Sequence, residues 1–143
     1  MDLEQKFNSA DISPSVDFLL GDSRQRLPEA LEKVHKAKLY PVLLFLDAHS
    51  GHETDICPLM EELKIIADFF FNRPEAPPPV IVIHDCMVPE KPFGFDVYVD
   101  GPISWDNLKA SIIPIYPTGY AQSYNEEAVG AARGCLFIEP AIS

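Results

Sequence analysis

Two short apolar runs, each ending in polar residues, constrain the fold of this chain more than any other feature. The first run is PVLLFLDAH, at residues 41–49, and the second is PVIVIHDC, at residues 79–86. Near-continuous apolar runs are typical of strands buried on both faces, as in a parallel sheet. Because ligands bind such sheets at the carboxyl ends of the strands, the polar residues there form the candidate site: Asp47, His49, His84 and Asp85.

The stretches around these runs carry helix patterns. Apolar side chains recur at helical spacing over residues 56–71 and, less regularly, over residues 24–38. Pro28 lies too deep for a helix capped by Ser23, so we expect a turn there and a regular helix from Pro28 onward. With a strand at Val16–Leu20, the order becomes β-α-β-α-β. This order predicts an α/β fold with a mostly parallel sheet, a Rossmann-like three-layer sandwich.

The last third of the chain changes character. Proline and glycine are frequent between residues 87 and 101, and a short helix is expected at Ser104–Ile112, with Ser104 as its N-cap. Gly134–Ile138 is the expected last strand, and a pairing with a strand near Ala121–Tyr124 is one option. We interpret residues 1–13 as a polar lead-in and residues 14–143 as a single domain.

Charge and cysteine content limit the class of partner. The chain has 22 acidic and 11 basic residues and a formal net charge of -11. Such a surface repels nucleic acids and anionic membranes, which argues against both as partners. No apolar run is long enough to cross a bilayer, and the N-terminus has no signal-peptide pattern. The three cysteines, an odd number without CxxC spacing, predict free thiols and a cytoplasmic protein.

Metal chemistry is one interpretation of the strand ends. Residues 47–55 contain two histidines and three carboxylates. The carboxylates of Asp47 and Asp85 suit Mg²⁺ or Mn²⁺, whereas the histidines, His49 and His52, would favour Zn²⁺ or Fe²⁺. A metal-dependent hydrolase that uses Asp47, His49 and Asp85 would follow. The alternative is a solvated polar loop in which Asp47 caps a turn.

Two further motifs admit both a functional and a structural interpretation. His84, Asp85 and Cys86 resemble a nucleophile with its base and orienting group, but strand alternation places Asp85 on the opposite face from the other two. Cys86 is therefore expected to be a small buried hydrophobic residue. Asp22, directly after Gly21, either accepts hydrogen bonds from a nucleoside or closes an Asx turn.

Taken in order, four segments resemble class I S-adenosylmethionine-dependent methyltransferases, in particular their small-molecule O-methyltransferase-like branch. They are GDSRQRLPEALE, FLDAHSGHETDICPLMEELKII, PVIVIHDCMVPEKPFGFD and RGCLFIEP. The resemblance covers about residues 16–140 and only the later part of the family domain. The family's glycine-rich cofactor loop and acidic ribose ligand are missing from this sequence.

The resemblance implies roles for individual residues. Asp22 and Ser23 would lie at the S-adenosylmethionine site. Asp47 and His84 would be catalytic, together with His49, which would serve as a base or a ligand. Asp47, His49 and Asp85 would hold a divalent metal such as Mg²⁺, as in some branches of the family.

The resemblance also implies a fold truncated at its N-terminal side. Without the two missing strands, the strand at Val16–Leu20 has no neighbour, and unpaired strand edges are unfavourable. A homodimer, a partner chain that completes the sheet, or an inward shift of this strand would solve the problem. Methyl transfer to a small-molecule substrate, as the resemblance implies, is the first functional hypothesis. A non-catalytic binding or assembly module that has kept the fold is the second.

Overall fold

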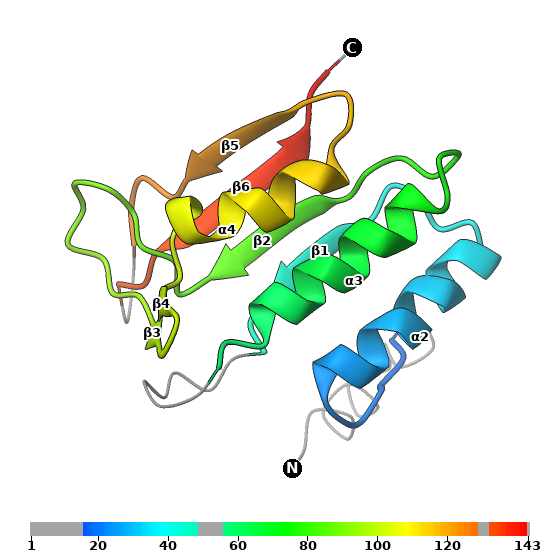
Figure 1. Ribbon diagram of the computed structural model, residues 1–143, viewed down its shortest axis with the longest axis horizontal. Coiled ribbons are helices and arrows are strands. Elements are labelled where there is room, and N and C mark those ends of the chain that lie inside the picture. The colour runs from blue at the N-terminus through cyan, green and yellow to red at the C-terminus, as the bar shows by residue number, and fades with distance from the viewer. Residues whose placement is uncertain (1–15, 49–55, 129–131, 143) are drawn as a thin grey trace.

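The protein is a mixed α/β structure built on a four-stranded sheet (Figure 1). The computed structural model describes residues 16–48, 56–128 and 132–142. Its helices are α2 (Ser23–Lys36), α3 (Leu59–Phe71), α4 (Trp105–Ile112) and the short 3₁₀ helix η2 (Ile113–Ile115). The sheet contains β1 (Leu43–Leu46), β2 (Val80–His84), β5 (Tyr120–Tyr124) and β6 (Cys135–Pro140), and β3 (Val97–Tyr98) pairs with β4 (Gly101–Pro102) separately.

The sheet is mixed, so the prediction of a mostly parallel sheet is wrong. The strand order is β1-β2-β6-β5. β1 and β2 are parallel and are joined through α3, as predicted, but β6 runs antiparallel to both of its neighbours. The expected pairing of the last strand with the segment near Ala121–Tyr124 is confirmed. The physical reason for the mixed sheet is the β5–β6 hairpin, which inserts β6 directly beside β2.

The N-terminal part differs from expectation in two ways. Val16–Leu20 forms no strand. α2 begins at Ser23 rather than at Pro28, because the side chain of Asp22 accepts a hydrogen bond from the backbone N–H of Arg24 at 2.9 Å and caps the helix. Pro28 is accommodated inside the helix. A strong local cap therefore outweighs the cost of an internal proline here.

The other helices agree with their sequence signals. The helix predicted from residue 56 begins at Leu59, directly after Pro58, and ends at Phe71 as expected. The N-cap of α4 is Ser104, whose Oγ accepts a hydrogen bond from the backbone N–H of Asn107 at 3.3 Å. No helix within the described ranges is long and apolar enough to cross a membrane.

The core lies between one face of the sheet and the helices. In Figure 1, α3 and α4 lie in front of the sheet, and α2 packs beside α3. The fully buried side chains of this layer include Leu63, Ile66, Ile81, Ile83, Leu136 and Ile138.

β1 is not buried on both faces, contrary to the prediction. Leu46 packs into the core, but the side chains on the opposite face, Leu43 and Phe45, are 63% and 57% exposed. The structure describes no helix over this second face near β1. β1 is also one of the two edge strands of the sheet. The candidate site lies at the end of β1, and the exposed face and edge of β1 form one surface of the molecule.

Candidate metal centre

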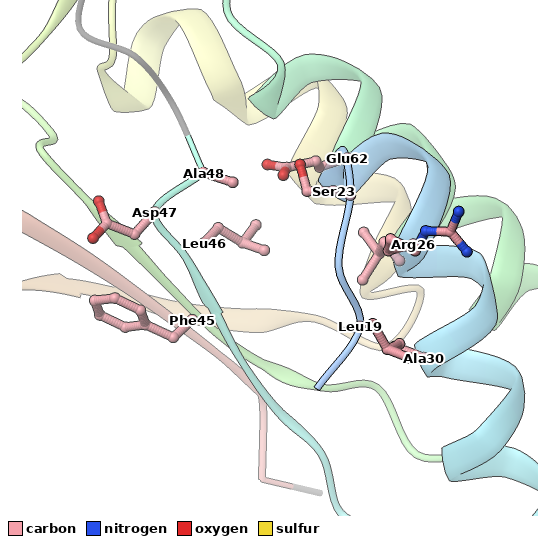
Figure 2. A pocket seen from close by; sticks show the side chains of 11 residues that line it. Leu19, Ser23, Arg26, Ala30, Phe45, Leu46, Asp47, Ala48 and Glu62 are labelled. Atoms are coloured by element: carbon pink, nitrogen blue, oxygen red, sulfur yellow. The ribbon is translucent and has the colours of Figure 1, made fainter. Parts of the chain in front are cut away.

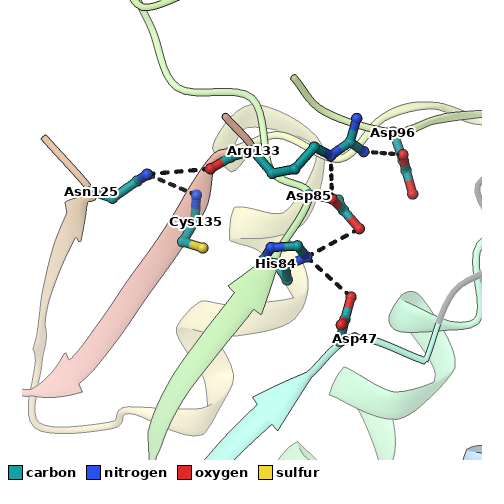
Figure 3. A network of polar contacts seen from close by, with 7 residues as sticks. All are labelled: Asp47, His84, Asp85, Asp96, Asn125, Arg133 and Cys135. Carbon is teal, nitrogen blue, oxygen red and sulfur yellow. Dashed lines mark hydrogen bonds and ion pairs between the residues drawn. The ribbon is translucent and has the colours of Figure 1, made fainter. Parts of the chain in front are cut away.

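The parallel pairing of β1 and β2 brings Asp47 and His84 together. Leu46 is the register partner of Ile83, so the next residue of each strand, Asp47 and His84, lies at the same level of the sheet. The His84 Nδ1 atom is 3.2 Å from Asp47 Oδ1 (Figure 3). His84 also lies near Phe45, with ring centroids 6.0 Å apart. The sequence-based expectation that these strand ends meet is confirmed.

Asp85 joins the same cluster through an unusual backbone conformation. Strand alternation predicted that its side chain would point away from His84. That prediction is wrong, because β2 ends at His84 and Asp85 has a φ of 59°, in the left-handed region. The carboxylate turns back toward the end of β2, and its Oδ2 atom lies 3.2 Å from His84 Nδ1.

The three side chains have the spacing of a cation site. One ligand atom from each of Asp47, His84 and Asp85 lies within 4.8 Å of the others. Ligand atoms held at about 2.1 Å from one ion are roughly 3.0–3.4 Å apart. The two measured His84–carboxylate distances of 3.2 Å fall in this range. Ionised carboxylates can only accept hydrogen bonds, so His84 must carry a proton on Nδ1 to bind Asp47 and Asp85 directly. A cation between the three side chains would take the place of that proton.

Arg133 fixes Asp85 from the other side (Figure 3). Its Nε donates to Asp85 Oδ1 and its Nη2 donates to Asp96 Oδ1. Hydrogen bonding to Asp85, above all, raises the pKa of Arg133 above its usual range, so the guanidinium stays charged. Because Arg133 occupies Oδ1, Asp85 keeps Oδ2 directed at His84. This arrangement resembles the outer-shell contacts that orient metal ligands in proteins.

Sequence reasoning missed Arg133 and Asp96. Arg133 lies two residues before the last strand, and its position follows from the antiparallel register that pairs His84 with Cys135. A prediction that β6 neighbours β2 would have placed Arg133 beside Asp85. No local motif carries that information.

The cysteines do not provide an activated nucleophile. All three are free, as predicted. Burial raises the pKa of the Cys86 thiol to about 12 and that of Cys57 to about 11. The pKa of Cys135, the cross-strand neighbour of His84, is raised by burial and by the charges of Asp85 and Asp47. Cys86 is fully buried, which confirms its interpretation as a small hydrophobic residue.

A pocket of about 420 Å³ lies between α2 and the end of β1 (Figure 2). Ser23, a predicted cofactor residue, and Asp47, a predicted catalytic residue, both line it. The buried carboxylate side chain of Glu62 lines it from α3, and Leu19, Leu27 and Leu46 provide apolar surface. Figure 2 shows that the Asp47 carboxylate points to the opposite side of β1 from Ser23 and Glu62, so Asp47 lines the pocket without directing its carboxylate toward Ser23.

Asp22, the other predicted cofactor residue, does not join the cluster. Asp22 points to Arg24, with its Oδ2 2.7 Å from Nη2, and this side-chain hydrogen bond lowers the pKa of Asp22 to about 2. Its observed role is therefore helix capping. His49 lies outside the described residues.

No protein-family model matches the sequence, and comparisons with curated proteins and with solved structures also gave no match.

Proposed function

We propose that the chain is a metal-dependent hydrolase of small molecules and that Asp47, His84 and Asp85 bind its divalent cation. The observation that carries this proposal is the convergence of three ligand atoms within 4.8 Å at the ends of β1 and β2. The proposal keeps the predicted ligands Asp47 and Asp85, and adds His84.

The local charge supports cation binding. Asp47, Asp85 and Asp96 contribute three negative charges, whereas Arg133 contributes one positive charge, and the whole chain has a net charge of -11. A site with excess negative charge attracts a cation. The mixed ligand set of one imidazole and two carboxylates suits Zn²⁺, Fe²⁺ or Mn²⁺ better than Mg²⁺.

The residues around the cluster divide the tasks of hydrolysis. A bound divalent cation would polarise an oxygen atom of the substrate or of water. The side chain of Asp47 is 46% exposed, so the carboxylate oxygen that does not bind the cation can accept a proton from water. Arg133 orients Asp85 and touches no reacting atom, so it is a positioning residue.

The first test is calorimetric titration of Mn²⁺ and Zn²⁺ into the purified chain. We expect one stoichiometric site and an affinity that falls about tenfold or more in Asp47→Asn, because the amide removes one charged ligand. Asp106→Asn is the matched control, since Asp106 is an exposed carboxylate on α4 that pairs with Lys109. The rate of hydrolysis of a p-nitrophenyl ester should fall in Asp47→Asn and stay unchanged in Asp106→Asn, in parallel with the metal affinity.

Equal metal affinity in Asp47→Asn and Asp106→Asn would show that the cluster is not the site. A folded chain that binds no cation would favour the non-catalytic binding module instead. Stoichiometric metal without ester hydrolysis would keep the metal centre and reject the hydrolase.

Methyl transfer from S-adenosylmethionine is the second candidate, and the pocket is the observation that favours it. The residues Gly21 and Ser23, from the segment that resembles the family's cofactor region, line the pocket together with Asp47. A Rossmann-like three-layer domain truncated at its N-terminal side, in a reducing cytoplasmic setting, belongs to the same proposal. The three free cysteines support that setting.

Titration of S-adenosylmethionine tests this candidate separately. We expect micromolar binding that Ala30→Phe weakens at least tenfold, because Ala30 lines the pocket and a phenyl ring would fill part of it. Ala121→Phe, an exposed position on β5, is the control. The absence of heat at millimolar ligand from a folded chain would reject methyl transfer.

A further inference from the structure

β1 is an edge strand that is suited to pair with another strand. It lies at one end of the sheet order and is paired with β2 on one side, and nothing in the described ranges pairs with its other side. An exposed edge presents backbone N–H and C=O groups that can bind a further strand. Natural proteins protect such an edge with a very short strand, charged residues, proline or a bulge. β1 is short, at four residues, but its sequence LLFL contains no charged residue and no proline.

The side chains of β1 add apolar surface to this edge. Leu43 and Phe45 are 63% and 57% exposed on the open face of the sheet. Phe45 is the first residue of an apolar row that continues through its register partner Val82 to Phe137 on β6. The opposite edge strand, β5, differs, because its exposed residues are the small side chains Ala121 and Ser123. The apolar edge of the sheet is therefore the β1 edge.

We propose that a second copy of this chain binds this edge, with the two β1 strands antiparallel across a twofold axis. A strand that matches this edge is short, uncharged and apolar on both faces. β1 itself has these properties, so the edge is complementary to the same edge of a second copy. The pairing would join two four-stranded sheets into one of eight strands. This inference does not depend on the metal centre.

The register of this pairing follows from the pleat. Residues directly opposite each other in an antiparallel pair share a face, so a residue of one copy pairs with a residue of the same face in the other. Pairing Leu44 with Leu44 places Leu43 opposite Phe45 of the second copy and covers both exposed side chains. Pairing Phe45 with Phe45 would instead place Leu43 against Asp47 and bury a charge. The first register is therefore favoured.

Charge opposes the association and gives it a measurable signature. Each copy has a net charge of -11, and like charges repel at low ionic strength. Added salt screens this repulsion beyond about 8–10 Å. The two Asp47 residues would lie about 20 Å apart along the joined strands, outside the paired segment. The dimer should therefore tighten as the salt concentration rises.

Sedimentation velocity of the full chain tests the proposal. We expect a concentration-dependent dimer between micromolar and millimolar protein, stronger in added NaCl, and a monomer for Leu43→Lys at the same concentrations. Leu43 does not belong to the metal cluster, and circular dichroism would confirm that the variant is folded. Ala121→Lys, the same change on the β5 edge, should leave the dimer intact.

Cross-linking tests the register. Leu44→Cys should form an intermolecular disulfide under mild oxidation, because the two residues 44 face each other at about 4.5–5.5 Å between Cα atoms. Phe45→Cys should form no such disulfide. The unsubstituted chain, treated in the same way, measures the cross-linking that comes from the native cysteines. A monomer at all concentrations, a dimer that survives Leu43→Lys but not Ala121→Lys, or cross-linking of Phe45→Cys alone would overturn the proposal.

Discussion

Replacement of Gly134 by alanine is expected to destabilise the protein by about 3 kcal/mol, and to lower its midpoint of thermal unfolding by about 10 °C. A Cβ atom at this position would lie 2.0 Å from the carbonyl oxygen of Cys86 and 2.8 Å from Cγ2 of Val88. The first contact is with backbone and cannot be relieved by a change of side-chain rotamer. The chain must therefore shift where β6 begins.

The same shift would disturb the metal centre. The Cys86 N–H donates to the Gly134 carbonyl at 3.0 Å, and the Gly134 N–H donates to the Gly94 carbonyl at 2.9 Å. Asp85 and Arg133 directly precede the residues that approach each other. Loss of stability in Gly134→Ala should therefore be accompanied by weaker Mn²⁺ binding.

Gly94→Ala is the matched control for this prediction. Its Cβ would lie 2.9 Å from Arg133 Nη1, a side-chain atom that can shift within the ion pairs with Asp85 and Asp96, whereas the contact of Gly134 is with backbone. We expect a smaller cost than for Gly134→Ala, about 1–2 kcal/mol in urea unfolding. Equal stability of Gly134→Ala and the unsubstituted chain would contradict the close approach of β6 to Cys86.

Local signals explain which elements could be predicted from the sequence. The helix over residues 56–71 has a regular apolar repeat and a proline at its start, and Ser104 is a strong N-cap, so both predictions succeeded. Asp22 is an equally strong cap, but Pro28 is a competing signal that favours a later start, so the predicted start of α2 is too late. In the structure, the Asp22 cap sets the start of α2, and Pro28 lies inside the helix.

Long-range pairing explains what could not be predicted. An apolar run such as LLFL fits a strand buried on both faces, and it also fits an edge strand with one open face. Only the position of β6 beside β2 decides between a parallel and a mixed sheet, and nothing in the run itself records that neighbour. The prediction of a mostly parallel sheet failed for this reason. The predicted burial of β1 on both faces failed because no described helix covers its second face, where Leu43 and Phe45 are exposed.

The same difference between local signals and long-range pairing explains which residues of the candidate site could be predicted. Asp47 and His84 follow from two parallel strand ends, which the apolar runs locate. Asp85 depends on a left-handed residue after β2, and Arg133 depends on the register of β6. These two residues complete the cluster, and neither has a sequence pattern that indicates its direction.

Arg133→Met is expected to cost about 2–3 kcal/mol of unfolding free energy, measured by urea denaturation. Arg133 bridges Asp85 and Asp96, and the three side chains are 28%, 15% and 17% exposed. Removing one partner of a buried ion pair costs about 3–5 kcal/mol, and partial exposure reduces this value. Methionine keeps the apolar stem of the side chain, so the loss reports mainly the charge and its hydrogen bonds.

A second substitution distinguishes the ion pairs from ordinary packing. In the unsubstituted chain, Asp96→Asn removes an ion pair with Arg133 and should lower stability. In the Arg133→Met background it should raise stability, because it removes one of two carboxylates that no longer share a cation. A similar loss from Asp96→Asn in both backgrounds would contradict the bridge, and Asp85 would then owe its orientation toward His84 to the backbone alone.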